Sequence, residues 1–227
     1  MDHPIAAEAQ RQHRPAVLAN RLRPERRWGR PCLAYNVCMR PGPAAAALAA
    51  VEDRVLSLEP SLLRVPVPAL HTNLAWLLPV HQEFGRPKDE LWQRHGPGWL
   101  AILTTVLGAA GSFRLCFRQL VATDAAIIVV ADEPNQVSVL RRELAPALPV
   151  PGGLSAGELV HTTLFRYGGP LRDPASLVHW LAAAEFHIDV DVSELLVIRE
   201  RIFPSLDYQV LHRLALAPSG PGDASVR

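Results

Sequence analysis

The chain has 227 residues, of which 49% are hydrophobic and 20% are charged, and its formal net charge is +1. A chain of this length and composition can bury a sizeable core, which excludes the disordered and fibrous classes. A net charge near zero also excludes attraction of nucleic acid by the molecule as a whole, so any such binding must depend on a local patch.

The two ends of the chain differ in composition from the part between them. Residues 1–30 carry seven arginines and no apolar stretch typical of a signal peptide, so we expect a flexible, arginine-rich arm. Residues 217–227 are rich in Gly, Pro and Ser, which predicts a disordered tail.

Hydrophobic periodicity and turn residues predict alternating strands and helices between these ends. Helices are expected to start at Pro43, after Pro87, near Pro97, at Pro134 and after Asp173, where Asp173-Pro174 reads as an N-cap and first helical position. Strands are expected over residues 32–39, 65–78, 113–118, 125–131, 159–167, 187–192, 195–202 and 208–216.

This order of elements predicts an α+β protein with two pseudo-symmetric lobes, each an antiparallel sheet with flanking helices. We expect a single bilobal domain over residues 31–216. The Pro- and Gly-containing stretch 149–157 is the expected hinge at which the two lobes meet.

The cysteines and the apolar runs bear on the compartment. Cys32, Cys38 and Cys116 form no C-x-x-C pair, which favours reduced thiols. No apolar run is long enough to span a bilayer. We therefore expect a cytoplasmic protein with no membrane partner.

Two short motifs carry most of the functional information: Leu70-His71-Thr72-Asn73-Leu74 and Val160-His161-Thr162-Thr163-Leu164. The histidines are 161 − 71 = 90 residues apart, so each half of the chain holds one motif. In an extended strand, residues i and i+2 share a face, which pairs each histidine with a hydrogen-bonding side chain. Such a pair suits acid–base chemistry on a phosphate, in which one imidazole removes a proton and the other delivers one.

These motifs, their spacing and their flanks resemble the 2H phosphoesterase superfamily, and within it the bacterial 2′-5′ RNA ligase and cyclic phosphodiesterase branch. The resemblance extends over roughly residues 31–216 and includes the run His161-Thr-Thr-Leu-Phe-Arg-Tyr167. It implies that His71 and His161 are the catalytic pair and lie in a cleft between the lobes.

The resemblance also assigns substrate-binding roles. Thr163 would hold a non-bridging phosphate oxygen. Arg166 matches a position where relatives often carry a basic residue that could neutralise phosphate charge. It can equally be read as an ordinary arginine at the end of a strand. Tyr167 could stack on a base or line the cleft, although an aromatic residue there can also serve packing alone.

The first motif departs from the family pattern at Asn73, where relatives carry Thr or Ser. The Asn73 amide can still donate a hydrogen bond to a phosphate oxygen, but it lacks a hydroxyl. Thr72 should point to the opposite face and cannot take over this role. Retained activity, altered substrate preference and a protein that mainly binds all stay open.

The function implied is a metal-independent phosphoesterase that hydrolyses 2′,3′-cyclic phosphate ends of RNA or a related cyclic nucleotide, with no cofactor. Reverse 2′-5′ RNA ligase activity would exchange the roles of the two histidines, and the pseudo-symmetry leaves open which of them is base and which is acid. The alternative is a non-catalytic RNA- or nucleotide-binding module that uses the same cleft. We expect a monomer in either case.

One further group of polar residues invites a metal-site interpretation. His187, Asp189 and Asp191 would share one face of a strand. The residues that alternate with them are apolar and need burial, so we expect the polar face to be solvated rather than to bind a metal.

Overall fold

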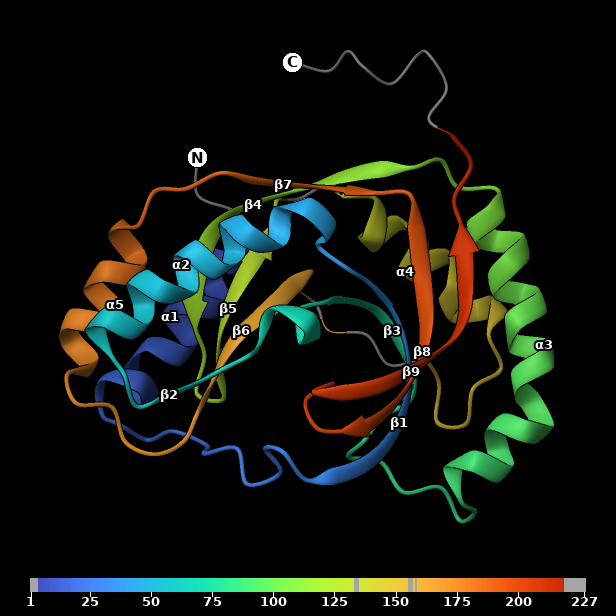
Figure 1. Ribbon diagram of the computed structural model, residues 1–227, viewed down its shortest axis with the longest axis horizontal. Helices are drawn as coiled ribbons and strands as arrows, with labels where there is room; N and C mark the ends of the chain where they lie inside the picture. The colour runs from blue at the N-terminus through green and yellow to red at the C-terminus, as the bar shows by residue number, and fades with distance from the viewer. Residues whose placement is uncertain (1–3, 133–134, 155–156, 158, 219–227) are drawn as a thin grey trace.

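The computed structural model describes residues 4–132, 135–154, 157 and 159–218 (Figure 1). Its α-helices are α1 Pro4–Leu18, α2 Ala45–Leu58, α3 Lys88–Gly108, α4 Gln136–Ala147 and α5 Pro174–Ala183. Its strands are β1 Pro31–Met39, β2 Leu62–Arg64, β3 Thr72–Leu78, β4 Phe113–Ala122, β5 Ala126–Ala131, β6 His161–Tyr167, β7 Ile188–Val192, β8 Glu194–Ile202 and β9 Asp207–Ala215.

The strands form one curled sheet in the order β7-β4-β5-β6-β3-β1-β8-β9, with β2 paired to β6 (Figure 1). Neighbouring strands of this sheet all pair antiparallel. At its centre, β3 and β6 meet through a single register pair, Thr72 opposite Thr162. This narrow junction divides the sheet into two lobes.

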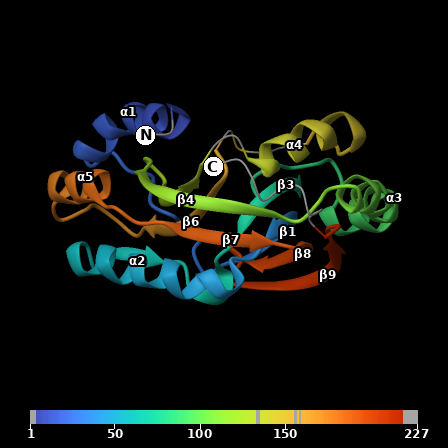
Figure 2. The same cartoon turned by 90° about the horizontal axis from the view of Figure 1, so that it is seen from above.

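We call these the β6 lobe (β7, β4, β5, β6 and β2) and the β3 lobe (β3, β1, β8 and β9). Helices α1 and α5 contact β4 and α2 contacts β6, whereas α4 contacts β3 and α3 contacts β9. Figure 2 shows α1 and α4 on one side of the sheet and α2 on the other. The predicted α+β class, with antiparallel pairing and flanking helices, is confirmed, but the two expected sheets are joined into one curled sheet.

A hinge at 149–157 implied that each lobe is one consecutive half of the chain. The structure differs from this expectation. The segment 149–157 does lead from α4 of the β3 lobe to β6 of the β6 lobe. However, β1 and β8 are neighbours in the β3 lobe although they lie on either side of that segment in the sequence. Each lobe therefore contains strands from both halves of the chain, and residues 149–157 form only one of several crossings.

The junction between the lobes is held by the middle residues of the two motifs. The hydroxyl oxygens of Thr72 and Thr162 lie 2.7 Å apart, and both residues are buried. Thr72 therefore points away from the face that carries His71 and Asn73, as expected from strand alternation.

We expect replacement of one junction threonine to cost more than replacement of both. Thr72→Val leaves the buried Thr162 hydroxyl without this partner, which should lower the free energy of unfolding by about 1–3 kcal/mol. The double variant with Thr162→Val removes both polar groups and should recover most of that loss. Urea denaturation of the two single variants and the double variant measures this coupling, and additive losses would contradict it.

The N-terminal segment is ordered over its described residues, which corrects the expectation of a flexible arm over residues 1–30. Helix α1 buries Ala6 and Val17, which are 1% and 0% exposed. Hydrogen bonds fix the turns that follow: the Asn20 side-chain amide donates to the Leu171 carbonyl, and the Glu25 backbone amide donates to the Tyr167 carbonyl. The apolar face of α1 and these contacts offset the entropy cost of ordering an arginine-rich segment.

Two other boundaries differ from expectation because of proline. The motif strand predicted over 65–78 begins only at Thr72, since Pro66 and Pro68 accompany a short 3₁₀-helix, η2 Val67–Ala69. Helix α3 continues through Pro97, where two helices were expected. Its buried stripe (Leu91, Trp99, Leu103 and Leu107) extends on both sides of Pro97, and this burial offsets the roughly 3 kcal/mol cost of an internal proline.

The remaining ends follow the sequence more closely. Asp173 caps α5, because its side chain accepts a hydrogen bond from the Ser176 amide. The Ala217 amide donates to the Ala110 carbonyl, and most of the tail predicted over 217–227 lies outside the described residues. Over the part of the chain that the structure describes, none of the helices has the length and apolar character needed to cross a bilayer.

Candidate active site

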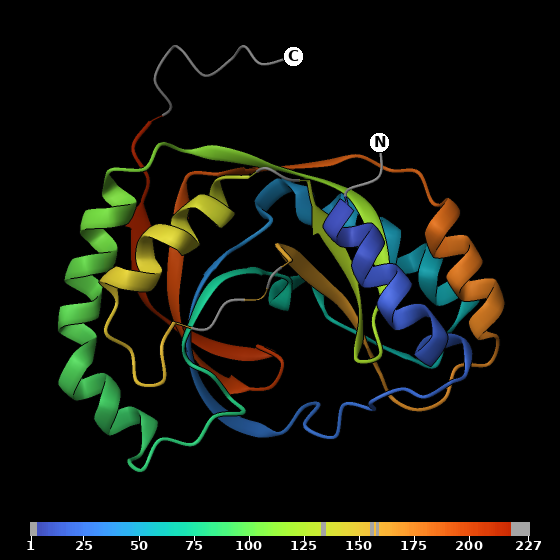
Figure 3. The same cartoon turned by 180° about the vertical axis from the view of Figure 1, so that it is seen from behind.

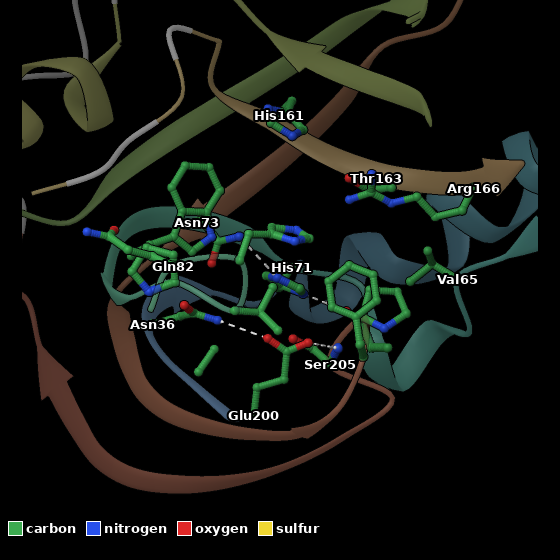
Figure 4. A pocket seen from close by; sticks show the side chains of 18 residues that line it. Asn36, Val65, His71, Asn73, Gln82, His161, Thr163, Arg166, Glu200 and Ser205 are labelled. Atoms are coloured by element: carbon green, nitrogen blue, oxygen red, sulfur yellow. Dashed lines mark hydrogen bonds between the residues drawn. The ribbon is translucent and has the colours of Figure 1, made fainter. Parts of the chain in front are cut away.

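A cavity of about 470 Å³ lies where the two lobes meet, and both motif histidines line it (Figure 4). The β6 lobe contributes His161, Thr163 and Arg166, and the β3 lobe contributes Asn73 of β3 and Glu200 of β8. Figure 4 shows His161 and Thr163 on one side of the cavity and His71 and Asn73 facing them from the other. The structure thus brings together the two motifs that are 90 residues apart in the sequence.

The two histidines are held in the same way. The ring Nδ1 of His71 lies 2.7 Å from the Ala69 carbonyl, and that of His161 lies 3.1 Å from the Leu159 carbonyl. A carbonyl only accepts, so each neutral ring carries its proton on Nδ1. Each Nε2 is then a proton acceptor, and a protonated ring can donate from the same atom.

A β-bulge in each motif strand decides which later side chains reach the cavity. In the β5–β6 pairing, Ile128 lies opposite Thr163 and Ile127 opposite Phe165, so Leu164 is the extra residue. In the β1–β3 pairing, Leu74 is extra in the same way, between Asn73 and Ala75. A bulge inverts the alternation of faces beyond it.

The bulges explain why residues five positions after each histidine line the cavity. Arg166 follows His161 by five residues and Trp76 follows His71 by five, and both side chains line the same cavity. In a strand with regular alternation of faces, both side chains would point away from the cavity. Arg166 was expected from the sequence, whereas Trp76 was missed, although the 90-residue spacing (166 − 76 = 90) marks it as the equivalent position.

Arg166 is a largely buried cation at the wall of the cavity. Its Nε is buried and has no hydrogen-bond partner among the described residues. Its guanidinium lies over the Phe203 ring, 5.9 Å from the centroid. Burial lowers the pKa of Arg166, opposed by the negative charge of Glu25. An unpaired donor of this kind suits an anionic oxygen.

Asn73 lines the cavity but its amide is engaged with the neighbouring histidine. Its Nδ2 lies 3.3 Å from Nε2 of His71, to which it donates. Its Oδ1 is buried without a hydrogen-bond partner in the described structure. The residue that departs from the family pattern therefore contacts the nitrogen that would perform acid–base chemistry.

Of the remaining predicted site residues, Thr163 reaches the cavity and Tyr167 does not. Tyr167 is 1% exposed, and its hydroxyl donates to the Thr123 carbonyl, 2.9 Å away. A base could not stack on a side chain buried in this way, so the expected substrate-binding role of Tyr167 is wrong. The aromatic residues that do line the cavity are Trp76 and Phe203.

Five polar residues at the cavity wall were not identified from the sequence: Asn36, His81, Gln82, Glu200 and Ser205. The Glu200 carboxylate accepts hydrogen bonds from the Ser205 amide and, at 3.4 Å, from the Asn36 side chain. Burial raises the pKa of Glu200 above that of an ordinary carboxyl group. Asn36 lies on β1, and Glu200 and Ser205 lie at the end of β8 and in the turn after it, so no short motif marks this cluster.

Arg141 of α4 fastens the two motif segments to each other. It donates to the carbonyls of Asn73 and Leu74 in β3, and at 2.7 Å to the carbonyl of Gly157, close before β6. Because the bonds reach backbone on both sides of the junction, Arg141 positions the two histidine-bearing segments without lining the cavity itself.

Comparisons with known proteins concern the fold. No protein-family model and no curated protein matches the sequence. The structure of TT0787 of Thermus thermophilus matches with a TM-score of 0.58 and 20% identity, covering 82% of this chain and 100% of that one. LigT of E. coli complexed with ATP matches with a TM-score of 0.52 and 14% identity, covering 82% and 99%. A protein described as a phosphoesterase gives 0.52 and 13%, with the same coverage.

The chain shares the LigT fold. The fold expected from the two motifs is thus confirmed. Identities of this size concern the fold alone, so the chemistry must be argued from the cavity.

In this cavity both histidines are neutral near pH 7. Burial lowers the pKa of His71 and of His161 from 6.5 to about 4, and the positive charge of Arg166 acts in the same direction on both. A bound phosphate would oppose both effects, because it supplies negative charge beside the rings. Protonation of a histidine and binding of an anion are therefore expected to favour each other.

We expect the two histidines to make the fold less stable in acid. The unfolded chain binds their protons near pH 6.5 and the folded protein only near pH 4, so stability should fall as the pH drops through this window. Glu52 acts in the opposite sense, since burial raises its pKa to about 7. Urea denaturation between pH 7 and pH 5 should show a smaller loss for the His71→Gln, His161→Gln double variant than for wild type. Equal losses would contradict the assignment.

One group within the described residues has the donor atoms for a metal ion. The ligand atoms of Cys116, His187 and Asp189 all lie within 4.8 Å of one another. Cys116 lies on β4, Asp189 lies on the edge strand β7, and His187 directly precedes β7. None of the three lines the cavity. His187 and Asp189 pair with each other at 2.7 Å, and Arg114 lies 3.6 Å from Asp189. The residues alternating with this polar face are buried, as expected.

Proposed function

We propose that the protein is a 2H-type phosphoesterase that opens the 2′,3′-cyclic phosphate at the end of an RNA or in a related cyclic nucleotide. The observation that carries the proposal is the pair His71 and His161. They come from two equivalent motifs, have identically fixed Nδ1 atoms, and face one cavity. Acid–base catalysis on a phosphodiester requires two such groups on opposite sides of the phosphorus.

The proposed reaction uses the free Nε2 of each ring. One neutral imidazole takes a proton from water as the water oxygen attacks phosphorus. The other imidazole, protonated, delivers its proton to the ribose oxygen as the phosphorus–oxygen bond breaks. If a 5′-hydroxyl takes the place of water, the same base removes its proton and the same acid protonates the departing 3′-oxygen, which would be the 2′-5′ ligase activity. The roles of the two histidines are exchanged only when that linkage is cleaved back to the cyclic phosphate.

Binding the anion is expected to prepare the acid. Because the pKa of each free histidine is about 4, few rings are protonated at pH 7 before substrate arrives. Phosphate charge beside Nε2 raises that pKa. Thr163 and the unpaired Nε of Arg166 are the donors proposed to hold the non-bridging oxygens.

The cavity suits a single nucleotide. A volume of about 470 Å³ falls within the range of small-ligand sites. Trp76 offers an aromatic face for a base, and the buried Oδ1 atoms of Asn36 and Asn73 are acceptors without partners in the described structure. LigT structures hold 3′-AMP and phosphate, which is consistent with a nucleotide ligand for this fold. The cavity is complete within one chain, so we expect a monomer to be active.

A nucleotide-binding module without turnover is the alternative, and the Asn73 contact is the observation that favours it. An amide that donates to Nε2 of His71 competes with the proton transfers proposed for that atom. Turnover requires that substrate displace the amide toward a phosphate oxygen.

The test is a short RNA ending in a 2′,3′-cyclic phosphate, incubated with wild type in EDTA. We expect ring opening without added metal, and the identity of the product, a 2′- or a 3′-phosphate, shows which ribose oxygen leaves. Binding of the RNA by folded wild type with no ring opening would refute the enzyme and support the binding module. In that case Asn73→Thr is the variant to assay next.

A further inference from the structure

A second hollow adjoins the cavity on the side of His161. This groove has a volume of about 360 Å³ and lies between α1 and strands β5 and β6. His161, Thr163 and Arg166 line both the cavity and the groove. A phosphate held by these three side chains would therefore lie at the passage between two compartments.

Helix α1 forms the outer wall of the groove because it covers the catalytic face of the β6 lobe. Ile128 and Val130 lie opposite Thr163 and His161 in the β5–β6 pairing, so these four side chains share a face. Ala6 of α1 packs on Ile128 and Val130 in one apolar cluster. Figure 3 shows α1 lying along this part of the sheet.

The groove combines an apolar floor with a polar rim. Ala9 of α1, Ala126 and Ile128 of β5, and Leu159 supply the apolar surface. Glu8, Gln12 and His13 of α1 and Asp124 of the β4–β5 turn supply the polar groups. Asp124 is paired with Arg23 at 2.7 Å and faces His13 at 3.3 Å.

The charges at the rim favour a neutral occupant over a second phosphate. Two carboxylates, Glu8 and Asp124, line the groove, and each is paired with an arginine: Glu8 with Arg11 and Asp124 with Arg23. Of the two arginines in the lining, Arg23 is held by Asp124 and Arg166 is assigned to the first phosphate, so a second phosphate would meet two carboxylates and no uncommitted lining arginine. A nucleoside, with a flat apolar face and several hydrogen-bonding edges, matches a floor and rim of this kind.

We propose that the groove under α1 is a second subsite, which binds a nucleoside esterified to the far side of the same phosphate. This rests on the proposed function, since the phosphate must lie between His71 and His161. The main cavity then holds the nucleoside on one side of the phosphodiester, and the groove holds the nucleoside on the other. The preferred ligand is a phosphodiester with nucleosides on both sides, and α1 is the element that selects it.

The test compares two ligands of equal charge by titration calorimetry. One is 2′-O-methyladenosine joined through its 3′-phosphate to the 5′-oxygen of a second adenosine, and the other carries a methyl group in place of that second adenosine. Methylation of the 2′-hydroxyl prevents cleavage by internal attack. We expect wild type to bind the dinucleoside ligand about tenfold more tightly, because the second nucleoside adds contacts without a second association cost.

Variants of α1 test whether the groove causes the tenfold gain in affinity for the dinucleoside ligand. Ala9→Phe fills the groove and should remove the tenfold difference while the affinity for the methyl ester stays within about twofold. Gln12→Ala should weaken only the dinucleoside ligand, and Gln10→Ala, on α1 but outside the groove lining, is the matched control. Hydrogen exchange on wild type is an independent readout, with protection of residues 5–13 expected from the dinucleoside ligand alone.

Failure of the subsite and failure of the proposed phosphoesterase function give different results. Equal affinities of wild type for the two ligands, or a tenfold gain that survives in Ala9→Phe, would overturn the subsite. Absence of added protection in α1 would overturn it even if Ala9→Phe failed to fold. Binding of neither ligand by wild type that opens the cyclic phosphate would overturn the subsite alone, whereas the absence of both binding and ring opening would refute the proposed function as well.

Discussion

Replacement of either His71 or His161 by alanine is expected to lower kcat/KM for an RNA 2′,3′-cyclic phosphate by about 10²- to 10⁴-fold. Each ring carries one of the two proton transfers. The third histidine of the lining, His81, has its Nδ1 against the Arg27 guanidinium and belongs to neither motif. Since the two transfers belong to one reaction, the double variant should lose little more than the worse single variant. Steady-state rates in EDTA over a range of substrate concentrations measure these losses.

A matched control excludes a general effect of losing a histidine. His187 lies outside the cavity lining, next to the edge strand β7, with a side chain 52% exposed, so His187→Ala should keep wild-type rates. Full activity in His71→Ala or His161→Ala would rule out the paired-histidine mechanism. Loss of activity with unchanged affinity for 3′-AMP would place the defect in proton transfer rather than in binding.

Replacement of Arg166 by methionine should weaken phosphate binding without weakening the fold. Hydrogen bonds to charged groups contribute about 1.5–3 kcal/mol each, so we expect a loss of about 10- to 100-fold in kcat/KM. The free energy of unfolding should stay constant or rise, because the variant removes a buried cation whose Nε has no partner in the described structure. Kinetics and urea denaturation on the same preparation test both halves of the prediction.

The same variant should move the titration of the catalytic pair. The charge of Arg166 is among the causes that lower the pKa of both histidines, so in Arg166→Met both values should rise. NMR titration of the ring protons would detect this. Arg114→Met, a paired and exposed arginine of β4, serves as the control, and Arg166→Lys should recover only part of the activity because lysine lacks the planar fork. A fold destabilised by Arg166→Met would show that the arginine is structural.

The sequence predicted the parts of the site that depend on local pattern. Alternation along a strand correctly placed His161 with Thr163 and His71 with Asn73, and it correctly turned Thr72 away. The cap at Asp173 was also predicted, since capping depends on residues three positions apart.

What the sequence did not predict depends on non-local packing. The bulges at Leu164 and Leu74 can be located only when the paired strands are known. Because of them, Tyr167 points away from the cavity and Trp76 lines it. The polar wall around Glu200 joins β1 to the end of β8, 164 residues away in the sequence. The arginine-rich composition of residues 1–30 concealed the few small apolar residues, such as Ala6, by which α1 binds the sheet.

The interleaving of the two lobes bears on how the molecule can come apart. A single cleavage within 149–157 would leave strands β1 to β5 on one fragment and strands β6 to β9 on the other. The β6 lobe needs strands from both fragments, and so does the β3 lobe. Neither fragment could fold alone, whereas the nicked pair would still share one core. Although the site lies between two lobes, we therefore expect the protein to melt in one cooperative transition rather than lobe by lobe.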